Sequence, residues 1–164
     1  MSDKLLADKL YLIALRFLAH KQRTEYEVIA KLQKYLSKVG ANKNSPELYE
    51  VINILKEERF LNDAEFISSY IDTQIISGKK SKLEIKKFLS KKGIQLSDVE
   101  DTYNSKGISD KESLEKLAQK KLNLISNKAL PDFKVKQKLA QYLISKGFAA
   151  DEVFDTIDSL MGVK

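Results

Sequence analysis

Lysines are the residues of this sequence best suited to act on a partner, and they are crowded into two stretches. Residues 79–92 hold seven lysines and one acid, Glu84, and residues 116–138 again hold seven lysines and one acid, Asp132. The whole chain has 29 basic and 23 acidic residues, so outside the two stretches the acids outnumber the bases by 21 to 15. The positive charge is therefore local, and local positive charge attracts phosphates or acidic protein surfaces.

Ten of these lysines are candidate contacts to a partner or to DNA. Lys79 and Lys80 stand just before a helix expected from Ser81, where free backbone amides and the helix dipole favour an anion. An ordinary solvated basic face explains the same pattern, and the sequence leaves both interpretations open. The candidates are Lys79, Lys80, Lys82, Lys86, Lys87, Lys91, Lys116, Lys120, Lys134 and Lys138.

The other chemically active residue types are too few for catalysis. Cysteine is absent, which removes disulfides, thiolate metal sites and cysteine nucleophiles. His20 is the only histidine, and its place near the end of an expected helix indicates a structural role, since the helix dipole favours a cation there. The six glycines are isolated from one another and make no phosphate-binding loop. We therefore expect a protein that is not an enzyme and that has no metal or cofactor.

The elements that position the lysines are predicted to be helices throughout, which makes the fold class all-α. Apolar residues recur with helical spacing, as in the stripe formed by Leu10, Ala14 and Phe17. No stretch has the ~18 uncharged apolar residues of a membrane span, and we expect no membrane contact. The predicted helices lie near residues 3–21, 24–39, 46–58, 62–77, 81–92, 97–105, 109–126, 132–146 and 150–161.

Capping residues support most of these helix starts. A hydroxyl three residues before a glutamate can cap one backbone amide while the glutamate reaches back to another. This spacing is found at Thr24–Glu27, Ser81–Glu84, Ser97–Glu100 and Ser109–Glu112. Asn62 with Glu65 is a variant, and Ser45 comes before a proline at the first helical position.

Three glycines that end predicted helices reveal an internal repeat. Gly40, Gly93 and Gly147 are separated by 53 and 54 residues, and an aromatic-leucine pair precedes each at the same distance. The pairs are Tyr35-Leu36, Phe88-Leu89 and Tyr142-Leu143. Their helical register with neighbouring leucines predicts that these aromatics pack in the core and do not stack on nucleic-acid bases.

The repeat predicts three tandem three-helix units over residues 1–59, 60–107 and 108–164. A unit of about 50 residues buries little surface alone, so packing between neighbours has to add stability. We expect an elongated, curved array, whose handedness the sequence does not predict. The middle unit has the densest positive face, and we expect it to make the main electrostatic contact.

Several segments, in this order along the chain, resemble the RecX family of recombination regulators. Residues 60–70, with Asp63 and then Ala64-Glu65-Phe66, resemble the central RecX motif. Residues 78–94 resemble the basic helix of that family's middle repeat, and residues 136–148 resemble its third-repeat helix.

The resemblance implies a non-enzymatic modulator of the RecA recombinase. RecX proteins are stacked three-helix modules that lie in the groove of the RecA filament on single-stranded DNA. They restrain its ATPase and strand exchange in DNA recombination, DNA repair and the SOS response. We expect the same of this chain, as a cytoplasmic monomer, and direct DNA binding is left open.

Two other functions fit the residues. Three-helix units can place a helix in the DNA major groove, so the chain could be an independent DNA-binding protein of the helix-turn-helix type. Against this, no helix has the mixture of Arg, Asn and Gln that reads base edges. A helical-repeat scaffold for another protein is the third interpretation.

Overall fold

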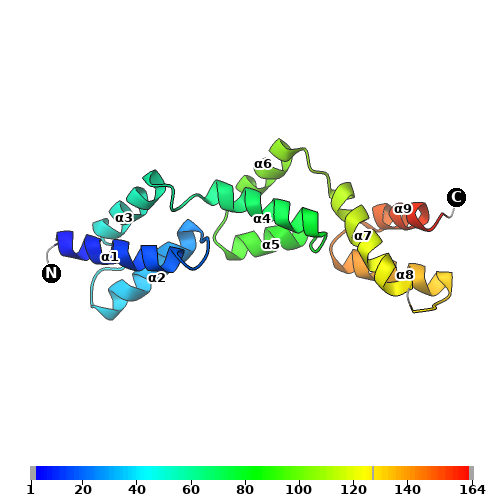
Figure 1. Ribbon diagram of the computed structural model, residues 1–164, viewed down its shortest axis with the longest axis horizontal. Helices are drawn as coiled ribbons and strands as arrows, with labels where there is room; N and C mark the ends of the chain where they lie inside the picture. The colour runs from blue at the N-terminus through cyan, green and yellow to red at the C-terminus, as the bar shows by residue number, and fades with distance from the viewer. Residues whose placement is uncertain (1–2, 127, 163–164) are drawn as a thin grey trace. The chain divides into compact units, whose positions relative to one another are not determined.

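The computed structural model describes residues 3–126 and 128–162. Within these ranges the chain forms nine α-helices and no strand, which confirms the all-α prediction (Figure 1). The helices are α1 (Asp3–Leu18), α2 (Glu25–Lys38), α3 (Pro46–Glu57), α4 (Asp63–Ser77), α5 (Lys82–Lys91), α6 (Leu96–Lys106), α7 (Asp110–Ser126), α8 (Asp132–Ser145) and α9 (Ala150–Met161). None of the described helices is long and apolar enough to cross a bilayer.

The end of α1 is the largest departure from the predicted helix bounds. The helix ends at Leu18 and does not continue to residue 21. Thr24 is extended, with φ −81° and ψ 158°, because it caps the start of α2. Residues 19–21 form a turn and a bend, so the chain leaves the helical conformation several residues before Thr24.

Four of the predicted caps form with a side-chain hydrogen bond. Full capping boxes are present at Thr24–Glu27 and Ser81–Glu84, where each glutamate side chain accepts the backbone amide of the cap residue. The amide of Glu112 donates to Ser109 Oγ at 3.3 Å, and the amide of Glu65 donates to Asn62 Oδ1 at 3.0 Å.

One cap prediction is wrong, and another is confirmed in position but without its side-chain hydrogen bond. Ser97 lies inside the first turn of α6, which begins at Leu96, and Glu100 pairs instead with lysines of α5. Ser45 precedes Pro46 as predicted, but its side chain makes no capping hydrogen bond. At Ser97 the spacing is present, but the ion pairs of Glu100 with α5 are formed in its place.

The chain divides into two compact units, and the division falls within the predicted middle repeat. The first unit consists of the residues up to 68 together with 89–98, and the second consists of 69–88 together with 99 onward. The repeat boundaries 1–59, 60–107 and 108–164 stay a prediction.

Each unit has its own core of helical apolar residues. In the first, α1, α2 and α3 pack against one another (Figure 1). Its fully buried side chains include Leu10, Ala14, Leu32, Leu36, Leu48 and Leu55. In the second, α7, α8 and α9 enclose Leu114, Leu117, Leu139, Leu143, Val153 and Ile157.

The three repeat aromatics pack inside their own units, as predicted. Tyr35 and Tyr142 are half-buried against the two cores. Phe88 stacks on Tyr70 with 4.4 Å between the ring centroids and 11° between the ring planes. These rings are therefore used in packing.

Candidate partner-binding surface

The two lysine-rich stretches meet in the second unit. Lys120 Nζ on α7 donates a hydrogen bond of 3.0 Å to the carbonyl oxygen of Ser77, the last residue of α4. A Cβ atom at Gly78 would lie 3.4 Å from the Cβ of Lys116. The turn between α4 and α5 therefore lies on the lysine face of α7. We call the set Lys79, Lys80, Lys116 and Lys120 the lysine surface.

Gly78 allows the left-handed turn that follows α4. It ends α4 with φ +54°, a conformation that residues with a side chain rarely adopt. It is also buried beneath α7. A residue with a side chain would be strained by this backbone conformation, although its Cβ would make only an ordinary contact with Lys116.

Five of the ten candidate lysines are exposed and make no ion pair among the described residues. They are Lys79, Lys87, Lys91, Lys134 and Lys138. Lys91 belongs to the first unit and the other four belong to the second. Because no neighbouring carboxylate neutralises them, these side chains keep their full charge for a partner.

Three of the other candidates already have carboxylate partners. Lys82 Nζ lies 2.9 Å from Glu100 Oε2, and Lys86 pairs with the same carboxylate. The hydrogen bonds from Lys86 and Lys82 hold the pKa of Glu100 below its usual range. Lys116 pairs with Glu112 at 2.9 Å, one turn away on α7. Ion pairs as exposed as these contribute at most about 1 kcal/mol, so a polyanionic partner can exchange them.

The remaining two candidates are held by uncharged groups. Lys80 Nζ donates to the hydroxyl of Tyr70 at 2.7 Å and lies 4.8 Å from the centroid of the Phe88 ring. Lys120 is held by the Ser77 carbonyl. These contacts fix the two ammonium groups in position without neutralising their charge.

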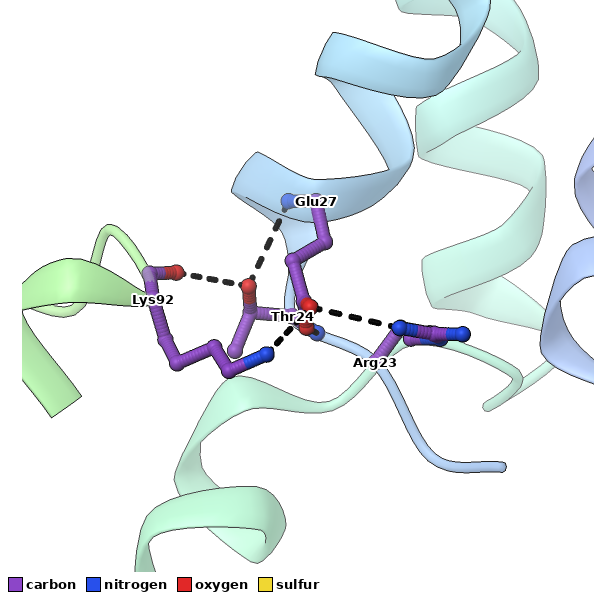
Figure 2. Close-up of polar contacts among 4 residues, drawn as sticks. All are labelled: Arg23, Thr24, Glu27 and Lys92. Carbon is purple, nitrogen blue, oxygen red and sulfur yellow. Dashed lines mark hydrogen bonds and ion pairs between the residues drawn. The ribbon is translucent and has the colours of Figure 1, made fainter. Parts of the chain in front are cut away.

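Lys92 was not among the candidates, and the structure gives it a different role. The start of α2 and the end of α5 meet in an arrangement that we call the first junction (Figure 2). There Thr24 Oγ1 donates to the carbonyl oxygen of Lys92 at 2.7 Å and accepts the amide of Glu27 at 3.3 Å. Lys92 Nζ donates to Glu27 Oε1 at 2.5 Å, and Arg23 Nη1 lies 3.4 Å from the same oxygen. The start of α2 is thus bonded to the end of α5.

A second junction repeats the same arrangement. Ser81 Oγ donates to the carbonyl oxygen of Lys146 at 2.6 Å and accepts the amide of Glu84 at 3.2 Å. Lys146 Nζ then donates to Glu84 Oε1 at 2.7 Å. The start of α5 is thus bonded to the end of α8.

The glycine after each junction lysine lies under a side chain of the partner helix. Gly93, with φ +79°, faces Tyr26, and Gly147, with φ +98°, faces Leu83. Gly40 has φ +69° and no atom within 4 Å of the place where a Cβ would be. Gly93 and Gly147 therefore end their helices and also lie in contact with a side chain of another helix.

Sequence analysis identified the caps and the stops separately and missed that they bind each other. A signal was present, because Lys-Gly preceded by an aromatic-leucine pair recurs at 92–93 and 146–147, each matched by an earlier hydroxyl–x–x–Glu start. Lys92 and Lys146 hold helix ends together, so Lys92 is a structural member of the first lysine-rich stretch.

The surroundings of Glu27 and Glu84, the two junction carboxylates, favour their ionised form. Burial opposes the charge of Glu84, but the hydrogen bonds from Lys146 and the Ser81 amide, with nearby lysine charge, together lower its pKa. The pKa of Glu27 is lowered in the same way, against burial, chiefly by Lys92 and the Thr24 amide. The hydrogen bond to Glu84 in turn raises the pKa of Lys146. Both junctions are therefore charged near neutral pH.

His20 is exposed and lies beside a shallow pocket with Phe17 and Lys31. In the part of the chain that the structure describes, no group of three His, Asp or Glu side chains could hold a metal ion.

These features define a helical-repeat protein, in which the capped start of one helix is bonded to the lysine end of another. The model of the third three-helix domain of RecX matches residues 109–157. The crystal structure of RecX from Lactobacillus salivarius superimposes with a TM-score of 0.75 at 30% identity, covering 96% of this chain and 98% of that one. This chain belongs to the RecX family.

Other comparisons agree with this placement. A second crystal structure, of a regulatory protein RecX, matches with a TM-score of 0.70 at 25% identity, over 96% of this chain and 74% of that one. Regulatory protein RecX of Streptococcus pneumoniae is 35% identical over 150 residues, and that of Streptococcus agalactiae is 33% identical over 148. Each alignment covers 90% of this chain and 55% or 54% of the relative. The chain thus spans about half the length of these curated relatives.

Proposed function

We propose that this chain regulates the RecA recombinase by binding in the groove of the RecA filament on single-stranded DNA. Bound there, it restrains ATP hydrolysis and strand exchange in recombination, DNA repair and the SOS response. It acts in the cytoplasm as a monomer, through binding alone and without a cofactor. Membership of the RecX family supports this role.

The observation that carries the proposal is the convergence of two lysine-rich stretches on one surface. The Lys120–Ser77 hydrogen bond brings α7 to the turn that holds Lys79 and Lys80. A nucleoprotein filament presents DNA phosphates and acidic side chains, and a concentrated positive field accelerates encounter with such a target. Lysine suits this task because its ammonium is a point charge that needs no fixed geometry.

Contacts from several repeats add to the affinity. Unpaired lysines occur in both units, with Lys91 in the first and Lys87 and Lys134 among those in the second. When linked modules bind one filament, each contact raises the effective concentration of the next. Individually weak electrostatic contacts therefore suffice for stable binding.

The test is filament binding by a charge-reversed protein. In Lys79→Glu with Lys87→Glu, two exposed, unpaired lysines of the second unit change sign. We expect binding to the RecA–single-stranded-DNA filament to weaken about tenfold or more at low salt, with the difference shrinking as salt is added. The matched control is Lys34→Glu with Lys43→Glu, which makes the same charge change at exposed lysines outside the candidate set.

Two outcomes contradict the proposal. Equal weakening by the control pair shows that only net charge matters, and no weakening shows that the surface is not used. Tight, salt-sensitive binding to duplex DNA without RecA supports the helix-turn-helix alternative instead. Recovery of another protein but not RecA supports the scaffold alternative.

A further inference from the structure

A groove runs between α1 and α3, which lie side by side in the first unit (Figure 1). Its volume is about 660 Å³, and one face of each helix borders it. The residues that line it have helical spacing, at positions 4, 7, 8 and 11 on α1 and at positions 47, 50, 51, 54 and 58 on α3. The groove therefore follows α1 for roughly 10 Å and α3 for roughly 16 Å. The ten candidate lysines, which all belong to the described residues, lie outside it.

The floor of the groove is apolar. Val51 is 1% exposed, and Ala7 and Tyr11 pack against the core of the first unit. Ile54 also lines the groove and is half-buried. A concave apolar floor gains free energy when the apolar side chains of a partner displace water from it. The size of the groove also suits a ligand, because binding pockets usually enclose about 300–1,000 Å³.

Carboxylates accompany this apolar floor. The lining includes four acids, none of which pairs with a lysine or arginine among the described residues: Asp8, Glu47, Glu50 and Glu58. Of the described residues that line the groove, Lys4 is the one base. The groove is therefore negative, although the whole chain has a net charge of +6. A groove of this charge attracts a basic partner and repels nucleic acid.

Folding does not account for these acids. Glu58 is the C-terminal cap of α3, where the helix dipole disfavours a negative charge. The Tyr11 hydroxyl donates to Glu58 Oε2 at 2.6 Å and holds the carboxylate beside the groove. Glu47 and Glu50 lie three residues apart on the same face of α3, so their charges repel each other. The dipole favours Glu47, in the first turn of α3, but not Glu50 or Glu58. A basic partner would relieve the repulsion among these charges.

We propose that this groove is a docking site for a basic amphipathic helix of a partner protein. The apolar stripe of such a helix packs on Ala7, Tyr11 and Ile54, and its lysines or arginines pair with the groove carboxylates. A helix fits because the groove is elongated and has an apolar floor, which is the arrangement that binds amphipathic helices in other proteins. A metal ion does not fit, because no three acidic side chains among the described residues are grouped so as to hold one.

This inference goes beyond the proposed function. The lysine surface selects a negatively charged target, whereas the groove selects a positively charged one. The chain therefore has two binding surfaces of opposite charge, and the groove leaves the lysine surface free. Loss of a buried aliphatic side chain from the partner helix weakens binding by roughly tenfold to a hundredfold, so the apolar stripe can be tested separately from the charge.

The first experiment uses the unsubstituted chain and a labelled synthetic helix about 15 residues long, the length at which an isolated helix becomes stable. Leucines form one face of this peptide and lysines form the other. One comparison peptide has glutamate in place of lysine. A second has alanine in place of leucine, which keeps the helix but removes most of the apolar contact. In fluorescence anisotropy at physiological salt, each comparison peptide should bind about tenfold more weakly, or weaker still, than the lysine–leucine helix.

The second experiment locates the site with two doubly substituted chains. Asp8→Lys with Glu50→Lys reverses the charge of two groove carboxylates. The matched control, Glu57→Lys with Asp101→Lys, makes the same charge change at acids outside the groove. All four side chains are exposed, so both proteins are expected to fold, which circular dichroism and urea unfolding verify. Binding of the lysine–leucine helix should weaken about tenfold or more in the Asp8/Glu50 protein and change little in the control.

Binding of the lysine–leucine helix that is lost in the Asp8/Glu50 protein but kept in the control supports the inference. Equal losses in the two proteins overturn it, because they show that only net charge matters. Equal binding of the lysine–alanine peptide overturns it as well, because the apolar floor is then not used. If the unsubstituted chain does not bind the lysine–leucine helix, the inference also fails. None of these measurements involves RecA, so their outcome is independent of the proposed function.

Discussion

Substituting the three repeat glycines with alanine measures how much the two junctions contribute to stability. Gly40, Gly93 and Gly147 all end a helix with positive φ, so each alanine incurs a similar backbone strain of about 1–2 kcal/mol. They differ in what surrounds the added methyl group. Gly40 is open, so Gly40→Ala is a matched control that shows the backbone strain alone.

The largest loss is expected for Gly93→Ala. The new methyl group would overlap the Cβ and ring carbons of Tyr26, and a Cβ cannot move without its backbone. The start of α2 and the end of α5 must therefore separate. Beyond the loss in Gly40→Ala, we expect the free energy of unfolding to fall by about 1–3 kcal/mol because of the overlap. Strain in the Thr24–Lys92 hydrogen bond should lower it by about 1 kcal/mol more.

An intermediate result is expected for Gly147→Ala. The overlap there is mainly with Cδ2 of Leu83, a terminal methyl on a side chain that is 43% exposed. Rotation of that side chain relieves the contact at a cost of about 0.5–1.5 kcal/mol. The loss of unfolding free energy should therefore be smallest for Gly40→Ala, intermediate for Gly147→Ala and largest for Gly93→Ala.

Urea unfolding followed by circular dichroism provides the measurement, with m-values compared so that midpoints translate into free energies. Equal losses in all three variants would refute the reasoning, since they would show that neither junction glycine is in contact in solution. A larger loss in Gly40→Ala than in Gly93→Ala would refute it as well.

Three other predictions concern the second junction and the ion pairs of the candidate lysines. Ser81→Ala removes both the cap of α5 and the hydrogen bond to the Lys146 carbonyl, and should lower the free energy of unfolding by about 1–2 kcal/mol. Ser109→Ala loses a cap alone, so the same urea titration should show a smaller decrease. Because folding lowers the pKa of Glu84, its ionised carboxylate stabilises the fold above the ordinary pKa of 4.5, and this stabilisation is lost as the pH falls through the lowered value. In urea unfolding at decreasing pH, the free energy of unfolding of Glu84→Gln should therefore fall less steeply than that of the unsubstituted protein. Glu100→Gln frees Lys82 and Lys86 and should tighten filament binding at low salt, a change that an unaltered dissociation constant would contradict.

The helices were predictable because their signals are local. Helical periodicity, the Thr24 and Ser81 boxes and the left-handed glycines are each set within a few residues of chain. The same locality explains the wrong cap at Ser97, because Glu100 is drawn to lysines of α5 that no short-range pattern indicates.

The candidate surface was predictable only in part. Charge counting identified lysines such as Lys79, which are exposed and unpaired, together with Lys82, which is paired across helices. It could not separate these groups, because pairing depends on how the helices pack. The role of Lys92 was hidden for the same reason, since its partner Thr24 lies 68 residues earlier.

The most direct measurement of regulatory action is the DNA-dependent ATPase of RecA with this protein titrated in. Binding in the filament groove predicts a rate that falls with increasing protein at fixed RecA and single-stranded DNA, and a smaller effect of the Lys79→Glu, Lys87→Glu protein. An ATPase rate and a filament lifetime that stay constant across the titration would contradict the proposed regulation of RecA.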